Sequence, residues 1–164
     1  MPTFDEIKAK AKLPTKAVPL CLRGDLQAEY EGLERDLQLL KDRQKRGGTL
    51  SGTSDELRAL EEKMAVLREE MQDSTQTFTM RALSKKQFSD LKAAKPPREE
   101  DKADGLDYNG ETFPVALVAA CLVDPALTVP QVEELVDTVF TQGQWDLLFW
   151  QGLLLNRGTV DIPR

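Results

Sequence analysis

The sequence predicts a mainly α-helical protein with a small antiparallel pair of β-strands. Two long heptad patterns predict a coiled-coil helical hairpin, and the short alternating runs on either side of it predict the strands. The C-terminal third is rich in apolar residues and helix-start signals, which predicts a helical bundle. We therefore expect an N-terminal part, residues 1–83, that carries the strand pair and the inserted hairpin at about 25–73. A C-terminal helical domain, residues 84–164, follows it.

The first residues predict a short helix and an edge strand. Residues 1–15 carry Phe4 and Ile7 on one side of a lead-in helix. In residues 16–23 apolar side chains alternate with others, which indicates a strand with one buried face. Proline lacks the N–H that a central strand would donate, so Pro19 places this strand at the edge of a sheet.

The predicted hairpin consists of two helices whose apolar residues recur at spacings of three and four. Asp25 is the expected N-cap of the first helix, which runs to about Arg46, and the second helix begins near Thr53 or Ser54. The Gly-rich stretch at 47–52 separates them and lacks the Gly-Lys-Ser/Thr ending of a phosphate-binding loop. We expect the two helices to pair within one chain, with pairing between chains as the alternative. The seam residues are Leu26, Tyr30, Leu33, Leu37 and Leu40, and then Leu57, Leu60, Met64, Leu67 and Met71.

A second strand and a series of helices are predicted after the hairpin. Residues 75–83 alternate in polarity, which indicates the strand. Residues 98–110 are charged, so we expect a loop or one helical turn; neither glycine register of a calcium loop puts carboxylates at the ligand positions. Residues 113–123 are apolar on nearly every side, which predicts a central helix. Capping boxes mark helix starts at Ser84 with Gln87, Thr128 with Gln131, and Thr141 with Gln144.

The last predicted helix, at about 143–156, carries more large apolar side chains than its neighbours can cover. Each of them could instead pack in the core, but we expect part of the group to bind a partner. The candidate partner-binding residues are Trp145, Phe149, Trp150, Leu153 and Phe113.

The composition argues against catalysis. Histidine is absent, which removes the commonest general base, the commonest metal ligand and every Cys-His or Ser-His nucleophile. Acidic pairs such as Glu61-Glu62 are adjacent, so their side chains point to different faces of a helix. We therefore expect a protein that is not an enzyme, with no catalytic residues, no cofactor and no metal site.

The charge and hydropathy pattern narrows the class of partner. The net charge is −6, which argues against nucleic acid as the main partner, and we interpret the basic run at 41–46 as a helix C-terminus. No apolar run reaches the roughly 18 residues of a membrane span, and the N-terminus has no apolar signal. We expect a cytoplasmic protein without a membrane partner, in which Cys21 and Cys121 are reduced, buried thiols.

Several short segments occur in an order that is similar to the tail assembly chaperones of long-tailed bacteriophages. They begin with Thr77-Phe78-Thr79-Met80-Arg81-Ala82-Leu83, Phe88, Leu91, Pro96-Pro97 and Tyr108-Asn109-Gly110-Glu111-Thr112-Phe113-Pro114. They continue with Ala119-Ala120-Cys121, Pro125, Leu127-Thr128, Val132, Leu135, Gly143-Gln144-Trp145, Leu148 and Asn156. The resemblance covers roughly residues 16–157, is strongest from residue 77 onward, and rests on pattern and order because no catalytic motif is part of it.

The resemblance implies a protein of the host cytoplasm that binds the long, apolar, helical tape-measure protein. Such chaperones keep this client soluble before the tail tube forms around it and are then shed. The family often makes a longer form by a programmed ribosomal frameshift, so self-association or binding to that form is a further candidate interaction. The alternative is a structural adaptor that oligomerises through its hairpin without chaperone activity. The hairpin is longer than that of a minimal family member.

Overall fold

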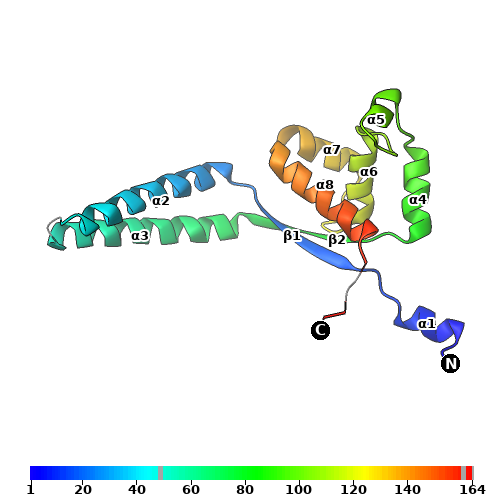
Figure 1. The fold of residues 1–164 in the computed structure, drawn as a ribbon, viewed down its shortest axis with the longest axis horizontal. Helices are drawn as coiled ribbons and strands as arrows, with labels where there is room; N and C mark the ends of the chain where they lie inside the picture. Colours follow the sequence, from blue (N-terminus) through cyan, green and yellow to red (C-terminus); the bar gives the residue numbers. More distant parts are fainter. Residues whose placement is uncertain (48–49, 160–161, 164) are drawn as a thin grey trace. The chain divides into compact units, whose positions relative to one another are not determined.

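The structure is a computed structural model that describes residues 1–47, 50–159 and 162–163. These residues are mainly helical, with a three-stranded antiparallel sheet in the order β1-β2-β3 (Figure 1). The strands are β1 (Thr15–Cys21), β2 (Thr75–Arg81) and β3 (Leu122–Asp124). The hairpin helices α2 (Gly24–Lys45) and α3 (Leu50–Asp73) lie between β1 and β2, which confirms the predicted insertion. Gly48 and Thr49 of the predicted Gly-rich turn lie outside the described residues.

Two compact units divide the chain. The hairpin unit is Pro19–Gln76, and the helical unit combines Met1–Val18 with Thr77–Arg164. The β2 and β3 residues that pair with each other belong to the helical unit. The division drawn from the sequence had instead grouped both predicted strands with the hairpin.

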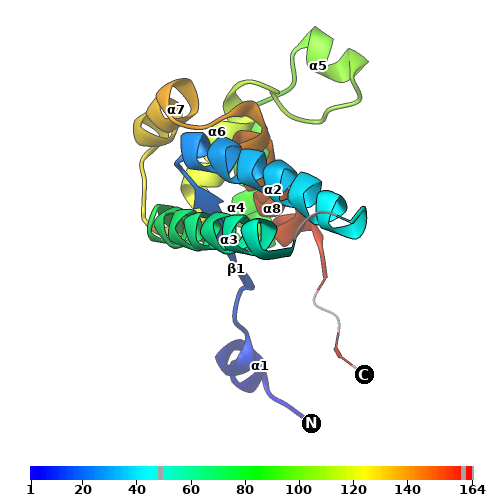
Figure 2. The same ribbon diagram turned by 90° about the vertical axis from the view of Figure 1, so that its left-hand side faces the viewer.

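The hairpin unit is held by the predicted heptad seam. Its helices α2 and α3 run side by side (Figures 1 and 2), so pairing within the chain is confirmed. The predicted N-cap is wrong: α2 begins at Gly24, its N-cap residue is Arg23, and Asp25 instead forms an ion pair of 2.8 Å with Arg23. Helix α3 begins at Leu50, a few residues earlier than expected. Across the seam, the Arg68 guanidinium donates a 2.7 Å hydrogen bond to the Tyr30 hydroxyl.

The sheet has one strand more than the sequence predicted. The helix expected over 113–123 ends at Cys121, and Leu122–Asp124 forms β3 beside β2, with Met80 opposite Leu122. The residue before a proline avoids the helical conformation, so Pro125 forces the chain out of the helix early. Strand β1 lies at the edge of the sheet, as Pro19 predicted.

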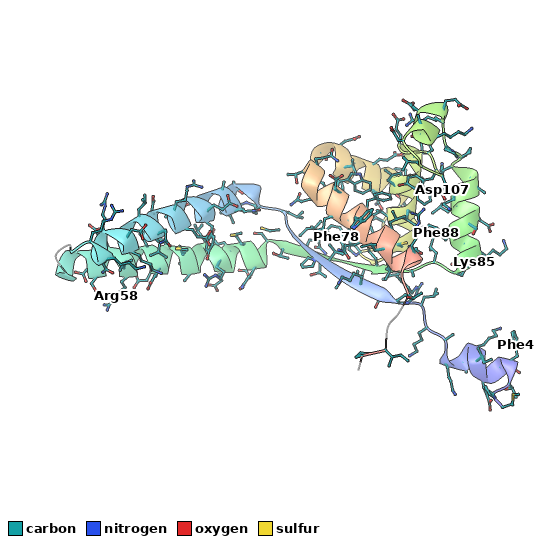
Figure 3. All side chains as sticks on the ribbon, in the orientation of Figure 1. Phe4, Arg58, Phe78, Lys85, Phe88 and Asp107 are labelled. Atoms are coloured by element: carbon teal, nitrogen blue, oxygen red, sulfur yellow. The ribbon has the colours of Figure 1, made fainter. Side chains whose placement is uncertain are left out.

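The helical unit is built around α6. Helix α6 packs against α8, α7 and α4, and its Phe113, Leu117 and Val118 are fully buried. Phe78 of β2 and Phe88 of α4 enter the same unit (Figure 3): Phe78 packs edge-on against Phe140, and Phe88 packs edge-on against Phe113. The helices are α1 (Phe4–Lys10), α4 (Lys85–Ala94), α5 (Glu99–Ala103), α6 (Thr112–Cys121), α7 (Val129–Thr138) and α8 (Gln142–Arg157).

All three predicted capping boxes are confirmed. Ser84, Thr128 and Thr141 each accept a hydrogen bond from the backbone three residues later. The side-chain oxygen of the Gln at that third position accepts a hydrogen bond from the cap residue's own N–H in each case. Within the described ranges, no helix is both long enough and apolar enough to cross a membrane.

Candidate partner-binding surface

One side of helix α8 packs against the rest of the helical unit. Leu148, Gly152 and Leu153 on this side are buried. Asn156, one turn beyond Gly152, is a polar junction: its Oδ1 accepts a 2.7 Å hydrogen bond from the Leu83 backbone N–H. Its Nδ2 donates to the Gly152 carbonyl at 2.7 Å. This side of α8 is therefore fixed by both packing and hydrogen bonds.

The opposite side of α8 is apolar and exposed. Leu147, Trp150 and Leu154 lie one turn apart, at spacings of three and four, and are 43%, 54% and 47% exposed. We call these three residues the α8 stripe. Asp146, Leu147, Phe149 and Trp150 line a shallow hollow of about 400 Å³ at its N-terminal end. Apolar residues at this spacing on a helix surface are what a second helix needs for docking.

A cluster of aromatic rings supports the flank of the stripe. The rings of Trp145 and Phe149 stack with centroids 6.5 Å apart, and Phe149 meets Tyr108 edge-on at 6.3 Å. Tyr108 in turn lies 4.5 Å from the Phe113 ring, centroid to centroid. Trp145 and Phe149 are consequently half-buried, and their positions depend on the loop that carries Tyr108.

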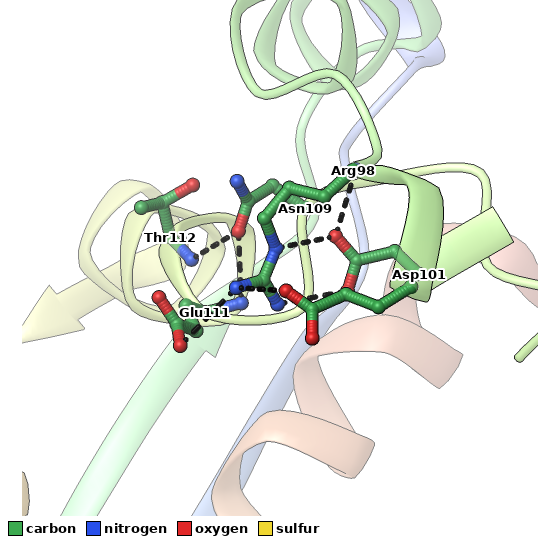
Figure 4. A network of polar contacts seen from close by, with 6 residues as sticks. Arg98, Asp101, Asn109, Glu111 and Thr112 are labelled. Carbon is green, nitrogen blue, oxygen red and sulfur yellow. Dashed lines mark hydrogen bonds and ion pairs between the residues drawn. The ribbon is translucent and has the colours of Figure 1, made fainter. Parts of the chain in front are cut away.

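A buried carboxylate organises that loop (Figure 4). Asp101 accepts hydrogen bonds from the backbone N–H and the guanidinium of Arg98, at 2.9–3.0 Å. The pKa of the Asp101 carboxyl is held well below its usual range, first by the hydrogen bonds from Arg98 and then by backbone N–H groups that include that of Gly110. A Cβ at Gly110 would come within 2.8 Å of Asp101 Oδ1, so only glycine fits there.

The same network sets the start of α6. Asn109 Oδ1 accepts hydrogen bonds from the backbone N–H groups of Glu111 and Thr112, at 2.9 and 3.1 Å. These bonds satisfy N–H groups at the beginning of the helix that have no partner inside it. The Arg98 guanidinium also reaches Glu111, at 3.2 Å. The segment from Arg98 to Thr112 is thus a rigid support for Tyr108 and the aromatic cluster.

The end of α8 is fixed by a second set of charges. Asp107 pairs with Lys92 of α4 and with Arg157 of α8. The hydrogen bond from Lys92 is the main cause that lowers the pKa of the Asp107 carboxyl, and the charge of Arg157 adds to it. These partly exposed pairs orient the helix end more than they stabilise the fold.

The candidate residues chosen from the sequence fall into three groups. Trp150 is exposed on the α8 stripe, whereas Trp145 and Phe149 are half-buried beside it. Phe113 and Leu153 are 0% and 4% exposed. In this conformation these two are core residues, so we do not carry them into the proposed surface.

The sequence interpretation missed two surface residues and one groove. Leu147 and Leu154 complete the α8 stripe. A groove of about 510 Å³ between α4, α6 and α7 was not expected either. Its floor is the small residues of α6, and their presence in an otherwise bulky apolar helix was the signal that could have revealed it. The apolar lining residues are Leu91, Ala116, Ala119, Ala120, Leu127 and Val129.

The buried thiol at Cys121 is a packing residue. It is fully buried, and the loss of solvent raises its pKa, so it stays protonated and unreactive. Cys21 is only half-buried, contrary to expectation.

Comparison with protein-family models, with curated proteins and with solved structures finds no match for this chain. Any function must therefore be argued from the residues and surfaces described above.

Proposed function

We propose that this protein is a phage tail assembly chaperone that binds an apolar helical part of the tape-measure protein and keeps it soluble. The observation that carries the proposal is the α8 stripe, where three large apolar side chains stand exposed at helical spacing. Adjoining apolar side chains on a helix surface mark a site of interaction, and a partner helix of matching spacing would cover them. The resemblance in residue order supplies the identity of the client.

The chemistry of the surface suits this role. The stripe has an acidic residue, Asp146, at one end and a basic residue, Arg157, at the other, so its rim is polar while its centre is apolar. A polar rim around an apolar centre is the usual arrangement of a protein interface. The net charge of −6 keeps the chain and its bound client soluble.

The size of the surface predicts weak, reversible binding. Fully burying a large apolar side chain stabilises by roughly 1.5–3 kcal/mol, so completing the burial of three half-exposed ones contributes about 2–4 kcal/mol. Association itself costs about 4–15 kcal/mol. The stripe alone is therefore too small, and the client must also contact the groove between α4, α6 and α7 or be covered by several copies along its length. Weak individual contacts also allow a chaperone to be displaced when the tube forms.

Co-expression with the tape-measure protein of the same phage tests the proposal. We expect the tape-measure protein to be insoluble alone and soluble with the wild-type chain. Trp150→Asp with Leu154→Asp should abolish this effect, because two charges on the stripe exclude an apolar helix. Both residues are exposed, so circular dichroism should show an intact fold.

A matched control uses exposed apolar residues elsewhere in the helical unit. Phe4 and Ile7 of α1 are 73% and 58% exposed, and Phe4→Asp with Ile7→Asp should leave the client soluble. Equal loss of solubility with both pairs of substitutions would mean that any exposed apolar residue serves, and the stripe would not be the binding site. An undiminished complex with the stripe variant would have the same consequence.

A further inference from the structure

One side of the hairpin unit carries an apolar groove with exposed side chains on both helices. Leu39 of α2 is 61% exposed and Val66 of α3 is 57% exposed. Two adjoining hollows of about 390 and 560 Å³ form the groove, and they share Ala59 and Lys63 as lining residues. A third hollow between the helices is lined by Gln38, Lys41, Gln44, Lys45 and Leu57. The exposed large apolar side chains of the described parts of α2 and α3, Leu39 and Val66, both line the groove with Ala59 at its middle instead.

Five of the six residues of α2 that line this groove form a pattern that is symmetric about one position. From the base of the hairpin toward its tip these five are Glu29, Leu33, Asp36, Leu39 and Arg43; the sixth, Leu40, is buried and has no symmetric counterpart. Asp36 lies midway between the two ends of this row. The row therefore has an acidic residue, Glu29, at one end and a basic residue, Arg43, at the other. Leu33 and Leu39 lie three residues before and after Asp36.

We propose that this face of the hairpin binds the same face of a second copy of the chain, with the two α2 helices antiparallel. A two-fold axis at Asp36 then places Glu29 against Arg43 of the second copy, and Leu33 against its Leu39. Asp36 meets its own symmetry mate, and Lys63, which lines the groove, supplies the compensating positive charge. Ala59 is small enough to let the two hairpins approach closely.

The charges of α2 that line the groove favour this orientation. Glu29 lies toward the base of the hairpin and Arg43 toward its tip, and both face the groove. An antiparallel pair brings Glu29 of each copy against Arg43 of the other, whereas a parallel α2 pair would set Glu29 against Glu29 and Arg43 against Arg43.

The area of the face sets the strength of the interaction. A helix of 22 residues is about 33 Å long, and two helices side by side are about 18–20 Å wide, so the face measures roughly 600 Å². Two such faces bury roughly 1,200 Å², the lower end of the range for specific complexes. The chain should therefore be a weak dimer, which forms reversibly in the range of roughly 10–500 μM and weakens as salt is added.

Sedimentation equilibrium of the full chain over this concentration range tests the dimer. Leu39→Asp with Val66→Asp should raise the dissociation constant at least about tenfold, because it puts charge into the apolar centre of the interface. Gln38→Asp is the control: it introduces the same side chain one position earlier, in the hollow that Gln38 and Leu57 line outside the proposed interface, and should leave the dimer unchanged. A monomer at every concentration would overturn the proposal, and so would a Leu39→Asp, Val66→Asp chain that still dimerises.

A charge exchange tests the antiparallel orientation. Glu29→Arg alone and Arg43→Glu alone should each weaken the dimer, since each opposes two like charges. The double variant should recover wild-type affinity, because the exchanged residues face each other again across the two-fold axis. A double variant as weak as the single ones would overturn the orientation. This outcome is independent of the α8 stripe, whose variants Trp150→Asp and Leu154→Asp should dimerise normally.

Discussion

Gly152 of α8 lies directly against Met80 of β2. A Cβ at position 152 would come within 2.7 Å of Met80 Cε, and Met80 is fully buried, so its terminal methyl group would have to shift among packed neighbours. This contact joins the last helix to the sheet and decides which side of α8 faces inward. The α8 stripe is exposed because it lies on the side opposite Gly152.

The first prediction concerns this contact. Gly152→Ala should destabilise the protein by about 1 kcal/mol, because overpacking of about 1–3 kcal/mol exceeds the helix-propensity gain of about 1 kcal/mol. Gly143→Ala in the same helix has no atom within 4 Å of the added Cβ and should be neutral or stabilising. Urea unfolding followed by circular dichroism measures both. A Gly152→Ala chain more stable than the Gly143→Ala chain would contradict this packing.

The second prediction concerns Asn156. Asn156→Ala removes the acceptor of the Leu83 N–H and the bond to the Gly152 carbonyl, and should cost about 1–2 kcal/mol of unfolding free energy. Gln151→Ala, which removes an amide side chain elsewhere on the same helix, should cost less than about 0.5 kcal/mol. Equal losses in the two variants, measured by urea unfolding, would show that Asn156 does not join the helix to residue 83.

The third prediction concerns pH. The pKa of Asp101 is lower in the folded chain than its ordinary value of 3.8, so its stabilising contribution is complete above about pH 5 and is lost progressively as the pH falls below that. Hydrogen bonding by Arg23 likewise lowers the pKa of Asp25, to about 2. The wild-type free energy of unfolding should fall between about pH 5 and pH 2.5. Asp101→Asn should reduce this slope without removing it.

The pH experiment needs a reference variant. Asp146→Asn removes an exposed carboxylate of α8 that has no part in the Arg98 network, and its unfolding free energy should follow the wild-type slope. If Asp101→Asn and Asp146→Asn change the slope equally, the Asp101 carboxylate does not stabilise the loop in the way described.

Local signals in the sequence were sufficient for the helices but not for all of the sheet. The capping boxes at Ser84, Thr128 and Thr141 depend on residues three apart, and the heptad seam depends on spacing within each helix, so both could be predicted. Strand β3 has only three residues and exists because β2 is beside it. No local pattern encodes such a pairing. The prediction of an N-cap at Asp25 was wrong because the Arg23 guanidinium, two residues earlier, forms an ion pair with the Asp25 carboxylate.

The orientation of α8 was the part of the site that periodicity could not determine. Large apolar side chains surround this helix, so spacing alone could not tell Trp150, which is exposed, from Leu153, which is buried. Gly152 was the available signal, because a glycine within an apolar helix often marks a close approach of another element. The exposure of Leu147 and Leu154 follows from this contact, because they lie on the side of α8 opposite that glycine.

The most direct test of the central claim is the fluorescence of Trp150 during client binding. The chain has two tryptophans, so Trp145→Phe leaves Trp150 as the only one and keeps an aromatic ring beside Phe149. On titration with a soluble fusion protein that carries an apolar helical segment of the tape-measure protein, we predict a saturable shift of the emission to shorter wavelength. An unchanged spectrum at concentrations where the segment binds the chain, or no binding at all, would contradict the assignment of the α8 stripe as the client surface.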